Sequence, residues 1–189
     1  FRSLALVLIR TRTEIRARRL KALLARSIDD VLIAGITDRP AVERCFAAGA
    51  GARVSLKVGG SLDPASPSVE VEADVVFLDN PGSAAEQQAV VKIGGITLVL
   101  AARRRPYHNI ADFTRLGLDP TKVRLLVVKS GYLSPELAPI ANPNLMALTD
   151  GVINQDIENQ TSKRRHQPTY PFVKDFSYTA KVFFSTRFP

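Results

Sequence analysis

Side chains that bind metals are scarce in this sequence. Its 189 residues include one cysteine, Cys45, and two histidines, His108 and His166, which lie far apart along the chain. A catalytic zinc site usually takes three protein ligands and keeps a fourth position open. The sequence also has no His-Glu-x-x-His motif and no pair of cysteines. We therefore expect no metal ligands and no cofactor site within this chain.

Motifs for covalent catalysis and for phosphate binding are also missing. There is no Gly-x-Ser-x-Gly sequence around a nucleophilic serine and no Walker A loop. Cys45 lies among apolar neighbours on a predicted helix, which favours a buried and inert thiol over a reactive one. The sequence therefore predicts no catalytic residue in this chain.

The apolar runs are short. The longest one near the start of the sequence, from Leu4 to Ile9, has six residues. A segment that spans a bilayer needs ~20 residues, and the apolar part of a secretory signal peptide is also longer than this run. A single cysteine cannot form an internal disulfide, which favours a reducing compartment. We therefore expect a cytoplasmic location and no membrane partner.

Positive charge is concentrated at one end of the chain. The formal net charge is +8, and residues 1–26 hold eight basic side chains against one acidic side chain. A basic helix there could contact the phosphates of a nucleic acid or of a membrane surface. The nearly neutral remainder has no stripe of Lys and Arg interleaved with aromatic residues. Nucleic-acid or membrane-surface binding through this segment is therefore an alternative function, and not the favoured one.

The pattern of apolar residues predicts an α/β fold with a mixed β-sheet. Continuous apolar runs at residues 31–36 and 125–128 are typical of buried central strands. Several segments between residues 53 and 100 alternate apolar with polar residues, which predicts an antiparallel portion of the sheet. A Gly94–Gly95 pair between two of these segments indicates a hairpin. Residues 159–189 lack this periodicity and are predicted to form an extended C-terminal tail.

Helices are expected to pack on this sheet. Favourable helix formers, capping residues and prolines placed in a first turn indicate where they begin. The predicted helices cover residues 10–26, a segment from Thr37 or Asp38 to Gly49 or Gly51, residues 110–116, and a segment that opens at Ser134.

Two polar stretches follow predicted strands and are candidate binding sites. Arg105 and His108 belong to an Arg-rich stretch after the hairpin, and guanidinium groups pair bidentately with carboxylates and phosphates. Lys129, Ser130 and Tyr132 follow the run at residues 125–128, and ligands of α/β sheets gather at the carboxyl ends of strands. A solvated strand end and an ordinary polar loop are the structural alternatives. A stand-alone module that binds a small anion is a further alternative function.

An ordered series of motifs in this sequence resembles the C-terminal domain of the microcystinase C (MlrC)-like zinc metallopeptidases. The resemblance covers about residues 20–189. Its motifs are Ile33–Thr37, Cys45–Ala52, Val91–Ile96, Arg103–His108, Asp112–Phe113, Leu116–Pro120, Val127–Leu137, Met146–Thr149, Asn154–Asp156, Lys163–Arg165 and Pro168–Phe172.

The resemblance implies a larger protein in which a preceding metallopeptidase domain holds zinc and cleaves peptide bonds, in the best-known members those of linearised microcystin. This chain would then support that catalytic domain or line its substrate cleft. Its expected partners are the N-terminal metallopeptidase domain, a peptide substrate and a second copy in a homodimer. Lys129, Ser130, Tyr132, Arg105 and His108 would be its substrate-binding residues.

One part of the chain departs from the resemblance. The family usually has a loop of the type Asp-Asn-Pro-Gly-Gly-Gly before the helix that corresponds to Leu20–Ala25, and residues 10–19 stand there in this sequence. A divergent extension, a truncation or an altered reading frame would each explain this departure. We therefore predict a basic helical segment over residues 1–26 that does not match the family, followed by an MlrC-like α/β domain over residues 27–189.

Overall fold

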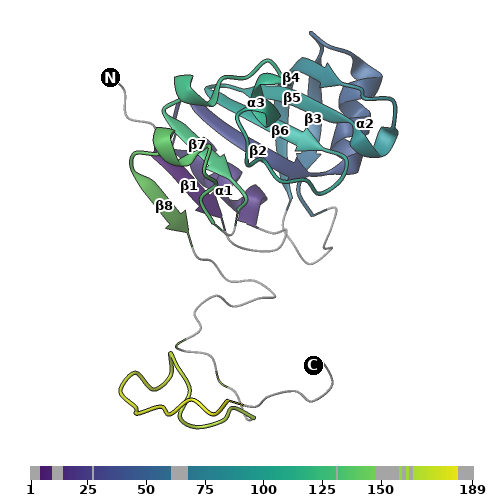
Figure 1. The fold of residues 1–189 in the computed structure, drawn as a ribbon. Coiled ribbons are helices and arrows are strands. Elements are labelled where there is room, and N and C mark those ends of the chain that lie inside the picture. Colours follow the sequence, from purple (N-terminus) through teal and green to yellow (C-terminus); the bar gives the residue numbers. More distant parts are fainter. Residues whose placement is uncertain are drawn as a thin grey trace, which may run out of the picture. The chain divides into compact units, whose positions relative to one another are not determined.

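A computed structural model describes residues 5–9, 15–26, 28–60, 68–130, 132–147, 158, 161 and 164–182. The chain forms two compact units, residues 1–153 and residues 154–189. The first unit holds all the helices and strands of the described residues (Figure 1). In chain order these are β1 (Ala5–Ile9), α1 (Ile15–Ala25), β2 (Val31–Thr37), α2 (Arg39–Ala48), β3 (Arg53–Val58), β4 (Val69–Asp79), the 3₁₀ turn η1 (Ala84–Glu86), β5 (Gln88–Ile93), β6 (Ile96–Ala101), α3 (Ala111–Thr114), η2 (Pro120–Lys122), β7 (Leu125–Val128), η3 (Ala138–Ile140) and β8 (Asn144–Ala147).

The eight strands form one mixed sheet in the order β3-β4-β5-β6-β2-β7-β1-β8. The strands from β3 to β6 pair in antiparallel fashion, whereas β6, β2, β7, β1 and β8 pair in parallel. The structure confirms the predicted α/β class and the antiparallel portion between residues 53 and 100. It also confirms the buried runs at residues 31–36 and 125–128 as neighbouring interior strands, β2 and β7.

The sequence did not predict the strands β1 and β8. Residues 1–26 were expected to be helical, but Ala5–Ile9 form a strand between β7 and β8, and the helix begins only at Ile15. Strand β8 was missed because its apolar run, Leu145–Ala147, is very short and shows no alternation with polar residues.

The expected helix after Ser134 is wrong. Residues 135–137 form a turn, and Ala138–Ile140 form a short 3₁₀ turn. Pro139 lies in that turn and has no backbone N–H, so an α-helix could not continue through it without losing a hydrogen bond. The helix expected around residues 110–116 is a single turn, Ala111–Thr114.

The two faces of the sheet are covered in different ways. Helices α1 and α2 pack on one face, where Leu20, Val42 and Cys45 join the alternate apolar residues of strands β2 to β7. Loops and short turns after β6 and β7 cover the other face, where Tyr107, Phe113, Leu116 and Leu137 pack on the sheet. Asp38 caps α2 by accepting a hydrogen bond from the Ala41 N–H, as the sequence suggested.

The second unit has no helix or strand among its described residues, in keeping with the predicted extended tail. Within it, the Arg165 guanidinium lies 3.8 Å from the centre of the Phe172 ring. The Lys174 ammonium is 3.2 Å from a carboxylate oxygen of Glu158. In the described part of the whole chain, no helix is long and apolar enough to cross a membrane.

Candidate functional site

The two predicted polar stretches come together at the carboxyl ends of β6 and β7. Ser130 Oγ lies 3.2 Å from His108 Nε2. The rings of His108 and Tyr132 are tilted, with their centres 5.3 Å apart. Strands β6 and β7 are both parallel to β2, which lies between them, so their carboxyl ends share one edge of the sheet. We call His108, Ser130 and Tyr132 the loop cluster.

The hydrogen bonds of Ser130 argue against a nucleophilic role for this residue. Its hydroxyl is buried and donates its one hydrogen to the Tyr132 carbonyl oxygen. The His108 Nε2 therefore has to be the donor in its contact with Ser130 Oγ, because a hydroxyl has one hydrogen. A serine nucleophile needs the opposite arrangement, in which the imidazole accepts the hydroxyl hydrogen. The contacts of Ser130 therefore do not fit a serine nucleophile activated by His108.

Arg105 reaches the loop cluster through Asp112. Its guanidinium lies 3.7 Å from Asp112 Oδ1 and 5.6 Å from the centre of the Tyr107 ring. The other oxygen of Asp112 accepts hydrogen bonds from the backbone N–H groups of His108 and Asn109, each at 3.0 Å. Arg105 therefore stabilises the carboxylate that holds the His108 backbone.

Lys129, the remaining predicted site residue, lies next to the loop cluster. It follows β7 directly and is half-buried, next to the buried Ser130. The structure thus brings His108, Ser130 and Tyr132 into contact and joins Arg105 to them through one carboxylate.

A buried side-chain network holds Tyr107, the residue before His108. Its hydroxyl donates to Gln88 Oε1 at 2.6 Å, and the Gln88 amide donates to Asp79 at 2.8 Å. Asp79 in turn pairs with Arg115 at 3.1 Å. The network connects β5 and the end of β4 to the loop after β6, so it fixes that loop on the sheet.

Gly35 makes room for the Tyr107 ring. It lies in the middle of β2 at a φ of +76°, where the pairing with β6 shifts register between Ile33 and Ile36. A Cβ at this position would lie 2.4 Å from Tyr107 Cε2. A glycine inside a strand often marks a bulge or a close approach, which is the one signal in the sequence that could have revealed this contact.

The loop after β7 contributes two further polar side chains that the sequence did not single out as functional. The Ser134 hydroxyl donates to the His108 carbonyl oxygen at 2.6 Å. A carboxylate oxygen of Glu136 accepts from the Ile110 N–H at 2.8 Å. These contacts join the loops after β6 and β7, so the loop cluster is supported from both sides.

Comparison with protein families shows which family this chain belongs to. Residues 15–164 match the family described as MlrC C-terminus. The chain belongs to the MlrC C-terminus family. The match begins at Ile15 and includes α1.

This chain shares its fold with part of a larger solved protein. The structure of a proposed metallopeptidase from Mesorhizobium sp. BNC1 has a TM-score of 0.65 and is 17% identical in sequence. The alignment covers 93% of this chain and 39% of that one. The chain therefore spans about two fifths of the length of that protein. No curated protein matches the chain.

The MlrC resemblance implies zinc in a preceding domain and no metal ligands in this chain. Among the described residues, no three His, Cys, Asp or Glu side chains gather closely enough to hold a metal ion. The His108 ring contacts a hydroxyl and an aromatic ring, and neither is a usual zinc ligand. We therefore assign no chemical step of this chain to a metal.

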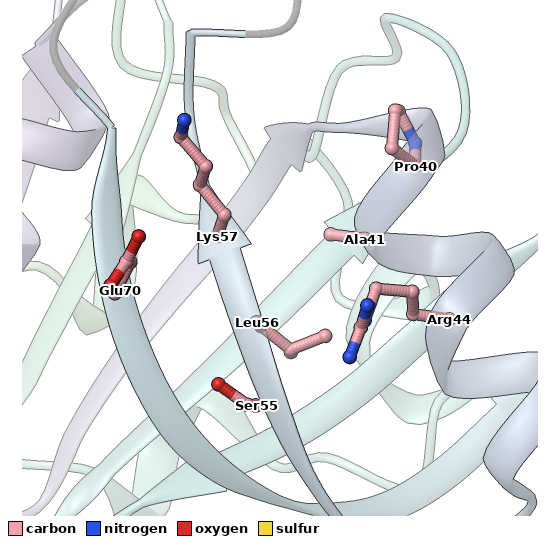
Figure 2. A pocket seen from close by; sticks show the side chains of 7 residues that line it. All are labelled: Pro40, Ala41, Arg44, Ser55, Leu56, Lys57 and Glu70. Atoms are coloured by element: carbon pink, nitrogen blue, oxygen red, sulfur yellow. The ribbon is translucent and has the colours of Figure 1, made fainter.

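A separate recess lies between α2 and β3, the first strand of the sheet (Figure 2). Its volume is about 290 Å³. None of the residues that line it belongs to a motif recognised in the sequence. Its lining is formed by Pro40, Ala41, Arg44, Ser55, Leu56, Lys57 and Glu70.

Proposed function

We propose that this chain is the C-terminal domain of a zinc metallopeptidase, that it supports the catalytic domain, and that its loop cluster lines the substrate cleft. Membership of the MlrC C-terminus family supports the association with a metallopeptidase. The convergence of His108, Ser130 and Tyr132 at the carboxyl ends of parallel strands carries the cleft role, because ligands of α/β sheets bind at that edge.

The loop cluster has the chemistry of a peptide-binding wall. Tyr132 has 61% of its surface exposed, so its phenol can donate to or accept from a peptide bond. His108 is fixed by Ser130 on one ring nitrogen and by backbone bonds to Asp112 and Ser134. A side chain held in this way loses little further entropy when a ligand binds. The cluster therefore orients substrate while the other domain supplies the zinc.

The finer parts of this proposal follow from the family resemblance. The substrate is a linear peptide of the microcystin type, and the protein is cytoplasmic. A second copy of the chain completes a homodimer. Cys45 is the one cysteine of the sequence and is buried, which agrees with a reducing compartment.

The alternative of a stand-alone anion-binding module has less support. Arg103 lies 2.5 Å from Glu86, and Arg105 lies 3.7 Å from Asp112. Two of the three arginines in the predicted anion site thus already have a carboxylate partner. Binding through the basic first helix stays a prediction, because the side chains of residues 15–19 lie outside the described part of the chain.

The test mixes this chain with the zinc-loaded metallopeptidase domain of a family member. We expect the two to co-elute in gel filtration, and the complex to hydrolyse a linear peptide faster than the metallopeptidase domain alone. The substitutions Tyr132→Ala and His108→Gln should each raise KM about fivefold or more, as expected when a buried contact to substrate is lost. Lys92→Gln, on the exposed side of β5, is the matched control and should leave KM unchanged.

Two results would contradict the proposal in different ways. Chelator-sensitive peptide cleavage by this chain alone would show that it holds a catalytic metal. Association with the metallopeptidase domain without any effect of Tyr132→Ala or His108→Gln would remove the cleft role and leave only the supporting role.

A further inference from the structure

Strand β3 has one free edge, and α2 overhangs it. It is the first strand in the sheet order, and among the described strands only β4 pairs with it. In an antiparallel pair, alternate residues turn their N–H and C=O groups away from the partner. Such a row of unpaired backbone groups is a template for another extended segment. The recess of about 290 Å³ opens along this edge (Figure 2).

A buried carboxylate fixes the two walls of the recess. Asp38 is 1% exposed, and its two oxygens accept from the Ala41 N–H at 3.2 Å and from the Gly59 N–H at 2.7 Å. These bonds tie the first turn of α2 to the residue that follows β3. The buried side chains of Ala41 and Leu56 form the apolar floor between the walls. The recess is therefore a preformed slot beside an edge strand.

The charge on this edge selects its partner. Three basic side chains are exposed there, Arg53 and Lys57 on β3 and Arg44 on α2, and one carboxylate, Glu70 of β4, also lines the recess. Figure 2 shows Arg44 reaching from the helix toward Leu56. Two copies of this edge would place basic side chains against each other, which disfavours self-pairing. An acidic segment is complementary to the same surface.

Strand β4 shows which sequence fits β3. On the paired side, Arg53 is opposite Asp74 and 3.7 Å from it, Ser55 is opposite Glu72, and Lys57 is opposite Glu70. The residues between these acids are Val71 and Ala73, which are buried. The partner that β3 already accepts is thus an alternation of acidic and small apolar residues.

We propose that the free edge of β3 binds an extended peptide segment of alternating acidic and apolar residues, which adds to the sheet as a further strand beneath α2. Backbone hydrogen bonds to β3 provide affinity, as in other domains that bind peptides by strand addition. Apolar side chains of the segment enter the slot beside Leu56 and Ala41. Its carboxylates point to the other face of the sheet, where Lys57 lies, and Arg44 adds positive charge on the side of α2. This inference is independent of the role proposed for the loop cluster.

The test measures binding of a fluorescently labelled peptide to the full chain by anisotropy. The probe is Val-Glu-Val-Glu-Ala-Asp-Val, the sequence of residues 69–75. We expect saturable binding that weakens with salt. Because each reversal replaces an attraction by a repulsion, Arg44→Glu and Lys57→Glu should each weaken binding by about tenfold. Arg124→Glu reverses another exposed arginine, just before β7, and should leave binding unchanged.

Further arms distinguish strand addition from other modes of binding. Hydrogen exchange should slow in residues 53–58 when the peptide is bound, and a proline in the centre of the peptide should abolish binding. Arg44→Gln and Lys57→Gln should each weaken binding less than the reversals do, and their circular dichroism should match that of the original chain. They keep the test valid if a reversed charge prevents folding.

Several results would overturn the proposal. These are no saturable binding, equal binding of Val-Lys-Val-Lys-Ala-Lys-Val, and binding that is insensitive to both charge reversals. Faster exchange in β4 upon binding would mean that the peptide displaces β4 and does not use the free edge. Self-association that Lys57→Glu disrupts would show that a second copy occupies the edge.

Discussion

The two faces of the sheet differ in how their covers satisfy backbone hydrogen bonds. Helices α1 and α2 cover one face, and the cluster of buried side chains there is apolar. Loops cover the other face, and there buried Gln88, Ser130 and Ser134 bond to loop atoms. A helix pairs its own backbone groups apart from its ends, whereas a loop needs partners from side chains.

This difference explains where the candidate site lies. Asp112 and Glu136 accept from three backbone N–H groups of the loop after β6, and Ser134 donates to a carbonyl of the same loop. Polar side chains are therefore required on this face to hold the loops. Tyr132, in one of these loops, is exposed to solvent. The residues that hold the loops on this face therefore lie next to the exposed ring of Tyr132.

The largest effect should come from closing the space under the Tyr107 ring. Gly35→Ala should lower the free energy of unfolding by about 3 kcal/mol, through a strained positive φ and overpacking against the ring. Gly49→Ala is the matched control, because Gly49 also has a positive φ but nothing lies within 4 Å of an added Cβ. It should lose about 1 kcal/mol. Equal losses in urea denaturation would show that Tyr107 does not pack on Gly35.

Removing one hydroxyl from the loop-covered face should have the next largest effect. Tyr107→Phe leaves the Gln88 side-chain oxygen without its donor in a buried position, and should cost about 2 kcal/mol in the free energy of unfolding. Tyr132→Phe removes the same group from an exposed ring and should cost less than about 0.5 kcal/mol. If urea denaturation gives the two variants the same stability, the buried network does not hold the loop.

On the helix-covered face, the buried Cys45 thiol should affect the free energy of unfolding only at alkaline pH. Burial raises the pKa of the Cys45 thiol from 9.0 to about 11, and Arg44 opposes this only in part. The unfolded chain therefore releases this proton first, so the stability that the thiol contributes is complete below pH 9 and is lost as the pH rises toward 11. Between pH 8 and pH 10 the loss should be about 1.3 kcal/mol. Over the same pH range, the free energy of unfolding of Cys45→Ala should fall by that much less than that of the original chain. An equal fall in both proteins would indicate that the thiol is accessible to solvent.

The smallest effect should come from weakening one acceptor of the loop after β6. Asp112→Asn keeps the shape of the side chain but removes the charge that accepts from His108 N–H and Asn109 N–H. We expect a loss of about 1 kcal/mol in the free energy of unfolding. Asp74→Asn, on exposed β4, should be nearly neutral because its ion pair with Arg53 is exposed to solvent. A larger loss of stability for Asp74→Asn than for Asp112→Asn would show that the carboxylate in the loop matters less than the one on the exposed strand.

The central strands and the antiparallel portion could be predicted because their residues carry a periodic signal. The apolar run of β2 and the alternation of β4 depend on which side chains are buried, and burial shows in the residue types. The approach of the two polar stretches was anticipated only in outline, from the rule that ligands bind where parallel strands end. The contact of Ser130 with His108 follows from strand order, which a single sequence does not give.

The supporting residues could not be predicted for a similar reason. Gln88 and Asp79 look like ordinary strand-end residues, and their importance arises from Tyr107, which is brought to them by the turn after β6. Strand β1 was considered only as a possible leader segment, because a five-residue apolar strand has too little periodicity to be distinguished from one.

The position of β1 has a consequence for how this chain can be shortened. Strand β8 pairs only with β1 among the described strands, and β1 pairs on its other side with β7. A fragment that starts at Ile15 would keep every residue of the family match, yet β8 would have lost its neighbour and β7 would become the last strand. Strand β8 depends on β1 for its place in the sheet, so a boundary drawn from the matched range alone would remove the strand that holds β8 beside β7.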